Sequence, residues 1–310
     1  MAMRQVISAR LEGAGTGAGT NYWSTGFGAE SGFENRVQKN WRVAGVFRKL
    51  RIKLVSLPSA GSTVTLTLRI NEADTALTVT CNDAQLTNIY TASDISVAVG
   101  DRVNIKTVNT GLGGGALTYS MEFEPTTGQQ SVYGGGTLNG SGSTPLYFSV
   151  MSDGIDTTRA NMAHVITADG TITSHGVCLD AAPGSANHVW TLYISTDNGA
   201  TWVVQDGSSG SPDTRVVPNA SRLGATTFSL SVTAGNLIIS QYDRLSGGGI
   251  NIYCQASFSF NPSTPGQFMF CGRSNDNTFN LGTAYAPATG SLAWNGAAIT
   301  SQSTLSGISD

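Results

Sequence analysis

The feature that most constrains the fold of this chain is a β unit that occurs twice. Its clearest part lies in residues 95–123, where apolar and polar residues alternate on both sides of the dipeptide Gly100-Asp101 and again after a triple glycine at 113–115. This alternation predicts two strands joined by a tight turn, followed by a loop and a third strand.

The same order of strands and turns returns at residues 230–260, so the chain is predicted to contain two copies of one unit. Gly235 takes the place of Gly100, and Phe258 or Phe260 takes the place of Phe123. Further matches 125 residues apart are Tyr22 with Tyr147, Gly45 with Gly170 and Leu54 with Leu179. At the next strand the match slips by one residue and aligns Val64, Leu66 and Leu68 with Trp190, Leu192 and Ile194.

Composition places the chain in the all-β class. Charged residues make up 12% of its 310 residues, against about 25% in ordinary globular proteins, and glycine contributes 38 residues. Many glycine turns and β-branched residues suit short strands with tight connections. We expect each antiparallel unit to close as a two-sheet sandwich of jelly-roll type.

The repeat predicts four parts. Residues 1–20 form an N-terminal strand and arm, 21–126 the first β-sandwich domain, 127–264 the second, and 265–310 a partial third unit or C-terminal extension. Within the first domain, residues 32–43 are the least strand-like and we expect them to be irregular.

The turn and strand sequence ISVAVGDRVNI, followed by a glycine loop and an aromatic-rich strand, resembles the end of C1q/TNF-like jelly-roll heads. That resemblance implies a trimer. The stretches TLRINEADTALTV and VAVGDRVNIKT are similar to a module common in structural proteins of tailed bacteriophages. This second resemblance implies a setting in a virion and no particular chemistry.

These resemblances favour a non-enzymatic virion structural protein of a tailed phage, displayed on the particle surface as a capsid decoration or head-surface protein. A tail or fibre component that attaches to the host is the alternative within the virion, and a carbohydrate-binding or glycan-processing module is the alternative outside it. Expected partners are other virion proteins of the capsid or tail, further copies of the chain in a homotrimer, and a host-surface glycan. The N-terminus has no apolar signal region and no run is long enough to span a membrane, so we expect synthesis in the host cytoplasm and no membrane insertion.

Charge is distributed unevenly along the chain. Residues 1–53 hold nine basic and three acidic residues, whereas 54–310 hold eight basic and seventeen acidic ones. A polarised chain can dock its basic end on an acidic partner. Seven side chains are therefore predicted to form an anchoring interface: Arg36, Lys39, Arg42, Arg48, Lys49, Arg51 and Lys53. The net charge of −3 and the scarcity of aromatic residues beside them argue against nucleic acid as the partner.

The C-terminal segment supplies a second predicted interface. An unfinished third unit would leave strand edges open, and a neighbouring subunit can cover such edges. We expect four aromatic residues to contribute to that contact: Phe268, Phe270, Tyr285 and Trp294.

One motif has the form of a catalytic-family signature but predicts only a turn. Residues 195–202 match the Asp-box pattern S-x-D-x-G-x-T-W of sialidases and related propellers, in which the box is structural. We expect a hairpin in which Asp197 accepts backbone N–H bonds, Gly199 takes a positive φ and Trp202 packs beneath.

No cofactor, metal or catalytic site is predicted. The histidines at 164, 175 and 188 have no carboxylate or cysteine at ligand spacing, and the four cysteines lie too far apart for a metal pattern. Cys81 and Cys254 lie on apolar strand faces and are predicted to be buried free thiols.

Overall fold

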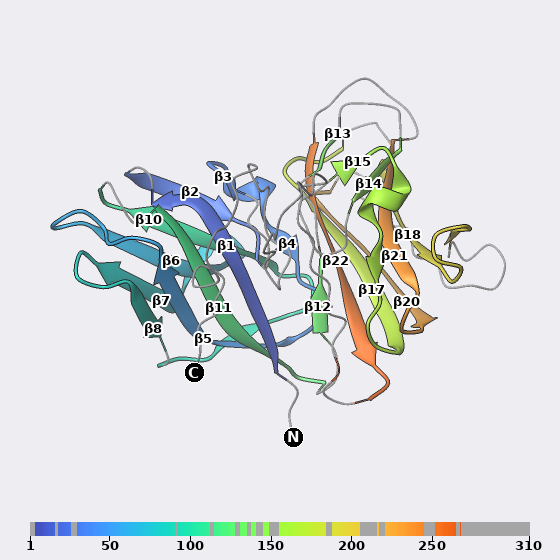
Figure 1. Cartoon of the computed structure of the whole chain (residues 1–310), viewed down its shortest axis with the longest axis horizontal. Coiled ribbons are helices and arrows are strands. Elements are labelled where there is room, and N and C mark those ends of the chain that lie inside the picture. Colours follow the sequence, from blue (N-terminus) through green and yellow to red (C-terminus); the bar gives the residue numbers. More distant parts are fainter. Residues whose placement is uncertain are drawn as a thin grey trace, which may run out of the picture.

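Two β-sandwiches follow one another along the chain, each built from two antiparallel sheets, and they lie side by side (Figure 1). The structure is a computed structural model. It describes residues 4–15, 18–25, 30–90, 92–111, 115–127, 131–134, 138–140, 145–148, 155–183, 188–204, 216, 221–244, 252–264 and 267.

The first sandwich contains strands β1 to β11. One sheet has the order β1 (Gln5–Gly15), β11 (Gly115–Pro125), β5 (Gly45–Leu54) and β8 (Thr87–Tyr90), with β9 (Ile95–Val97) also paired to β5. The other has the order β3 (Glu30–Ser31), β2 (Gly19–Trp23), β10 (Arg102–Asn109), β6 (Thr63–Ile70) and β7 (Ala73–Asn82), with β4 (Lys39–Asn40) also paired to β10. A short 3-10 helix, η1 (Glu34–Arg36), precedes β4.

The second sandwich repeats this plan. One sheet has the order β12 (Ser131–Tyr133), β22 (Ile252–Pro262), β17 (Gly170–Leu179) and β20 (Leu223–Val232), with β13 (Leu138–Gly140) also paired to β22. The other has the order β15 (Ile155–Asp156), β14 (Leu146–Phe148), β21 (Leu237–Arg244), β18 (His188–Ser195) and β19 (Val203–Val204), with β16 (His164–Val165) also paired to β21. The 3-10 helix η2 (Arg159–Met162) matches η1.

The predicted fold class is confirmed: the described residues form tandem antiparallel sandwiches in which strands alternate between two sheets, as in a jelly roll. The strand expected at Gln5–Leu11 exists but was wrongly separated from the first domain. It pairs with β11 from Gln5 to Leu11 as an edge strand of the first sandwich, so this strand belongs to the first domain.

Strand pairing fixes the register of the repeat. Gly45 lies opposite Pro125 and Gly170 opposite Pro262, so Phe260 is the equivalent of Phe123. The predicted match of β6 with β18 was wrong by two residues. The Gly100 and Gly235 turns align β10 with β21, and the residues of β6 and β18 that pair with equivalent positions on these two strands are the true equivalents. The equivalent pairs are Leu66 with Trp190, Leu68 with Leu192 and Ile70 with Ile194.

Glycine is required at the first residue of β5 and of β17, where the neighbouring strand of the same sheet lies very close. A Cβ on Gly45 would lie 2.4 Å from the carbonyl oxygen of Glu124, and one on Gly170 would lie 2.5 Å from that of Asn261. Both contacts are too short for any side chain, so the same packing constraint holds in both copies.

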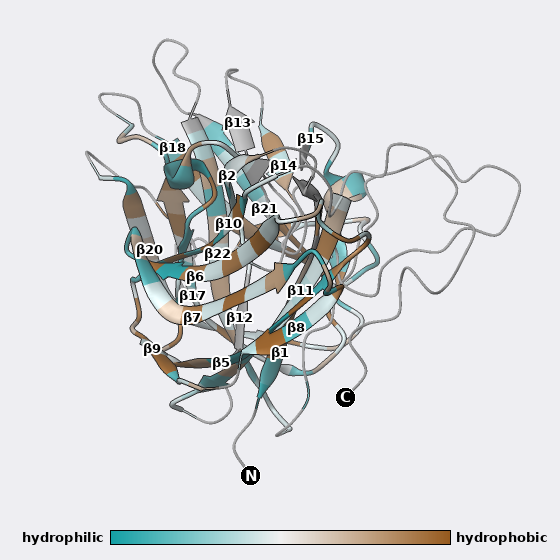
Figure 2. Cartoon of the chain, turned by 90° about the vertical axis from the view of Figure 1, so that its left-hand side faces the viewer, coloured by the Kyte–Doolittle hydropathy of each residue, from teal (hydrophilic) through white to brown (hydrophobic). Residues whose placement is uncertain are grey.

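The cores differ more than the strand order does. Hydrophobic and hydrophilic residues alternate along strands such as β11, most of whose residues are buried (Figure 2). In the first sandwich the buried residues form one continuous cluster around Trp41, Phe47 and Phe123, whose ring centroids lie 4.9–5.1 Å apart. In the second, the buried residues that the structure describes divide into two clusters, one around Phe260 and one around Trp190.

Candidate functional site

The segment predicted to be irregular, residues 32–43, lies between the two sandwiches, where β4 separates them (Figure 1). It brings three polar side chains into a buried position: Lys39, Asn40 and Arg42 are each at most 9% exposed. Buried polar groups are stable only when they are hydrogen-bonded, so their partners define this interface, which we call the seam.

The partners across the seam lie on β17, β20 and β22. Asn40 Nδ2 donates to the carbonyl oxygens of Val177 at 3.3 Å and Gly224 at 3.1 Å. Arg42 Nε donates to Ser174 Oγ at 3.3 Å. The backbone at Gly176 is close enough that an added Cβ would lie 2.7 Å from Arg42 Cδ. The outer face of this sheet therefore accepts the first sandwich only because its residues are small.

Charge inside the seam is perturbed by burial. Desolvation holds the pKa of Lys39 well below its usual range and also lowers the pKa of Arg42. Lys39 Nζ donates to two carbonyl oxygens, those of Thr25 and Gly134. The bond to Gly134 is available only when the two sandwiches are docked, because Gly134 belongs to the second.

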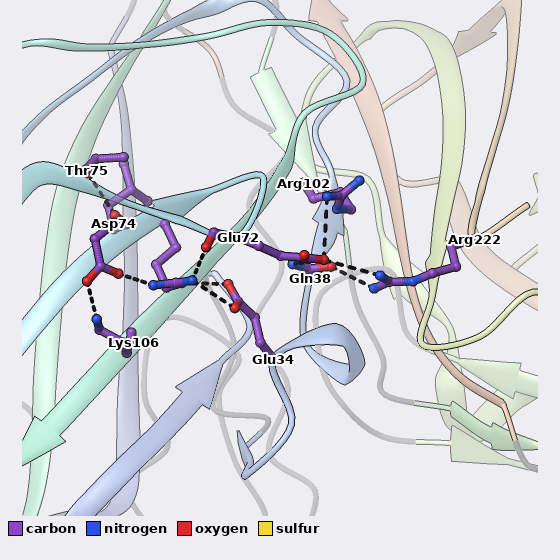
Figure 3. A network of polar contacts seen from close by, with 10 residues as sticks. Glu34, Gln38, Glu72, Asp74, Thr75, Arg102, Lys106 and Arg222 are labelled. Carbon is purple, nitrogen blue, oxygen red and sulfur yellow. Dashed lines mark hydrogen bonds and ion pairs between the residues drawn. The ribbon is translucent and has the colours of Figure 1, made fainter.

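Ion pairs close the rim of the seam. Arg36 lies 3.5 Å from an Asp180 carboxylate oxygen and stacks 4.2 Å from the centroid of Tyr253. At another point Arg222 reaches from the second sandwich to Glu72 at 3.2 Å and to Gln38 at 2.8 Å (Figure 3). Arg36, Lys39 and Arg42 of the predicted anchoring set thus contact the second sandwich of the same chain.

The other predicted basic residues lie together on β5. Arg48 pairs with Asp94 at 2.9 Å and with Glu124 at 3.1 Å, and Lys49 pairs with Glu122 at 3.0 Å. Arg51 and Lys53 follow on the same strand and are partly exposed. We call Arg48, Lys49, Arg51 and Lys53 the β5 basic strip; its binding of a partner stays a prediction. Phe268, Phe270, Tyr285 and Trp294 lie outside the described residues.

A polar cluster covers the outer face of the sheet that contains β2, β10 and β6. Arg69 Nε donates to Glu34 at 2.7 Å, and Arg69 also pairs with Asp74, which in turn pairs with Lys106 (Figure 3). Arg69 lies 5.8 Å from the ring centroid of Tyr22. Each positive side chain in this cluster has an acidic partner.

The second sandwich places a different cluster at the equivalent position. Arg159 on η2 stands where η1 has Glu34, and Tyr193 on β18 stands where β6 has Arg69. The guanidinium carbon of Arg159 lies 4.4 Å from the ring centroid of Tyr193, 5.0 Å from that of Tyr147 and 5.8 Å from that of Trp202. We call Arg159, Tyr147, Tyr193, Trp202 and Gln241 the Arg159 cluster.

The hydrogen bonds of Arg159 go to neutral groups. Nη2 donates to Tyr147 Oη at 3.2 Å and to Gln241 Oε1 at 3.3 Å, while the amide of Gln241 donates to Asp243. Nε is buried and has no hydrogen-bond partner. Among the residues that the structure describes, no carboxylate lies within ion-pair distance of Arg159.

The hairpin at residues 195–202 has the geometry predicted for an Asp-box. Asp197 Oδ1 accepts the Thr201 N–H at 2.8 Å, Gly199 has φ +89°, and Trp202 Nε1 donates to the Gly199 carbonyl at 3.1 Å. Hydrogen bonds from the Thr201 hydroxyl, the Thr201 amide and the Ser195 hydroxyl lower the pKa of Asp197 to about 2. Because its oxygens are engaged within the hairpin, Asp197 fixes the position of Trp202.

Sequence reasoning missed both the seam and the Arg159 cluster. The available signal for the cluster was the repeat itself: aligning the copies 125 residues apart sets Arg159 on Glu34. A charge reversal between equivalent positions indicates that the partners have changed too.

Other chemistry has little support in the described part of the chain. No group of three or more metal-ligating side chains occurs there, and none of its helices could cross a membrane. Cys81 and Cys254 are buried free thiols, as predicted, and Cys178 is a third. Burial raises the pKa of Cys81 to about 11, which makes its thiolate scarce at neutral pH.

No protein-family model and no curated protein sequence matches the chain. Similar solved structures include recombinant N-glycanase F (PNGase F), with 10% identity and a TM-score of 0.25 over 84% of this chain and 96% of that one. Broad Bean Stain Virus gives 9% identity and 0.25 over 84% and 89%, and the tandem CBM22 domains of Paenibacillus barcinonensis Xyn10C give 12% and 0.23 over 73% and 81%. Viral and glycan-related β proteins thus both occur among the neighbours, at TM-scores too low to assign a function.

Proposed function

We propose that this chain is a non-enzymatic structural protein of a tailed-phage virion, displayed on the particle surface as a capsid decoration or head-surface protein. The observation that carries the proposal is the seam, because it joins two sandwiches into one building block through buried polar contacts. An assembly unit needs a fixed arrangement of its domains, and polar groups that are satisfied only in the docked state favour a single arrangement.

The β5 basic strip is the proposed attachment surface. Its residues are partly exposed, and the ion pair of Arg48 with the partly exposed Glu124 lies near the surface, where such pairs contribute little stability and can be exchanged for those of a partner. An acidic surface on the capsid or tail fits this strip. We propose in addition that the chain forms a trimer, with residues 266–310 at the contact between subunits.

Localisation of the protein on purified particles tests this proposal. We expect gold-labelled antibodies against the chain to mark the capsid surface of the phage that encodes it, and we expect washing at raised ionic strength to release the label. Labelling confined to the tail would replace the head-surface role with the alternative of a tail or fibre component. Intact particles without the protein would overturn the virion role.

Charge reversal separates attachment from folding. The triple variant Arg48→Glu, Arg51→Glu, Lys53→Glu is expected to leave particles at lower ionic strength than the wild type does, while the single variant Arg222→Gln, located at the seam, is expected to keep its salt dependence. Attachment that is equally strong in the triple variant would show that the β5 basic strip is only a solvated face.

A further inference from the structure

We propose that the Arg159 cluster binds saccharides that carry a carboxylate. The inference goes beyond the structural role proposed above and does not depend on it. It starts from the difference between two equivalent places in the repeat, one of which has its charges balanced while the other does not.

In the first sandwich, the polar cluster at this position has all its charges paired. Two basic side chains, Arg69 and Lys106, are paired there with two acidic ones, Glu34 and Asp74 (Figure 3). In the second sandwich the matching positions hold Arg159, Tyr193 and Gln241, so one positive charge remains without an acidic partner among the described residues. Nη1 of Arg159 makes no hydrogen bond to the described residues and is not buried, so an anion from outside the chain can pair with the guanidinium there.

The surroundings of Arg159 favour a carboxylate. Its guanidinium lies against the rings of Tyr193, Tyr147 and Trp202, and stacking engages the faces of the planar group. Nη2 already donates to Tyr147 and Gln241 and Nε is buried, so Nη1 is the donor left for a ligand, and a carboxylate is the acceptor that suits a charged donor best.

The same surroundings favour a sugar as the carrier of the carboxylate. Tyr147, Tyr193 and Trp202 are each partly exposed, and aromatic rings with polar edges offer both an apolar surface and hydrogen-bonding groups. Asp243, held by the Gln241 amide, is a further acceptor for hydroxyl groups on this face. Nucleic acid is disfavoured, because residues 54–310 carry seventeen acidic residues against eight basic ones.

The Asp-box hairpin explains how the site is kept in place. Asp197 accepts hydrogen bonds from the hydroxyls of Ser195 and Thr201 and so orders the turn. Within the same turn, the Gly199 carbonyl accepts the indole N–H of Trp202. One ring of the cluster is thus positioned by a short hairpin and the other two by β14 and β18. Pre-positioned rings reduce the entropy lost when a ligand binds.

Calorimetric titration of the full chain tests the proposal with three probes: 3′-sialyllactose, trigalacturonic acid and, as the neutral counterpart, lactose. We expect at least one acidic probe to bind roughly tenfold more tightly than lactose, and we expect Arg159→Gln to abolish this preference. Arg4→Gln is the matched control, since Arg4 is an ion-paired arginine on the first sandwich, and it should leave binding unchanged.

A second measurement guards against a variant that fails to fold. In the wild-type chain the side-chain Nε–H resonance of Arg159 should shift on addition of the acidic probe and stay in place on addition of lactose. Acidic probes that bind no better than lactose, or binding that survives Arg159→Gln in a folded protein, would overturn the proposal. Neither result would bear on whether the chain belongs to a virion.

Discussion

The two sandwiches use the same outer sheet face in opposite ways. On the first sandwich this face carries the charged side chains of Arg51 and Glu122, which remain partly hydrated. At the equivalent places the second sandwich has Gly176 and Ser259, and the first sandwich packs on that face. The same strand order is compatible with a solvent-exposed face and with a domain interface. The size and charge of the outward-facing residues decide which of the two forms.

The polar clusters on the other sheets differ in the same sense. Where the first sandwich closes its cluster with ion pairs between Glu34, Arg69 and Asp74, the second leaves Arg159 among aromatic rings. The inward-facing residues form the core of the same fold in both copies, whereas the outward-facing residues give each copy different surface contacts. The predictions that follow exchange or remove residues at equivalent positions.

The largest effect is expected from giving Gly176 the side chain that the first copy has at this place. Gly176→Arg puts a long charged group where a Cβ alone would lie 2.7 Å from Arg42 Cδ. We expect the seam to open at a cost of about 3 kcal/mol, since overpacking and a further buried charge act together. Denaturant unfolding should then separate into two transitions, and small-angle scattering should give a larger radius of gyration.

The reciprocal position supplies the control for that experiment. Arg51→Ala removes a partly exposed side chain from the open face and should change the unfolding free energy by no more than about 0.5 kcal/mol. A single, unchanged unfolding transition in Gly176→Arg would mean that the two sandwiches are not held by the seam.

The next effect compares the two polar clusters. Arg69→Ala leaves Glu34 and Asp74 facing one another without their shared cation, and we expect it to destabilise the chain by about 2 kcal/mol at low ionic strength, less in salt. Arg159→Ala leaves no carboxylate without its ion-pair partner, and it should lower the unfolding free energy by about 0.5–1 kcal/mol because packing is lost. Equal losses in urea unfolding would contradict the distinction between a closed and an open cluster.

A smaller effect should be the same in both sandwiches. Gly100 and Gly235 have φ values of +95° and +91°, and an added Cβ at either would meet open space. Gly100→Ala and Gly235→Ala are therefore each expected to cost about 1 kcal/mol from backbone strain alone. A large difference between the two variants, measured by urea unfolding, would show that the turns are equivalent in sequence but not in structure.

The parts of the molecule that follow from local pattern could be predicted from the sequence. Alternation gave β10 and β11, the spacing of Gly100 and Gly235 gave the repeat, and the Asp-box hairpin followed from turn chemistry. The partners of Lys39 and Arg42 across the seam could not be predicted, because these contacts come from residues more than ninety positions away. A basic side chain beside Trp41 looks the same in sequence whether water or a second domain covers it.

The Asp-box hairpin has no counterpart in the first sandwich, where residues 71 and 72 join β6 to β7. Changing a hydrogen bond within this hairpin is expected to have the smallest effect of the four comparisons. The pKa of Asp197 is about 2, below the ordinary value of 3.8, chiefly because of the Thr201 hydroxyl. A carboxylate with a lowered folded-state pKa adds stability that is present above its unfolded pKa and is lost as pH falls through about 2. Thr201→Val should therefore raise the pKa of Asp197 towards 3.8 and move the acid-induced loosening of the hairpin to higher pH.

Thr196→Val is the control, because Thr196 is an exposed residue of the same turn. Carboxylate NMR titration measures both, and an Asp197 pKa that stays near 2 in Thr201→Val would assign the shift to the backbone amide instead of the hydroxyl.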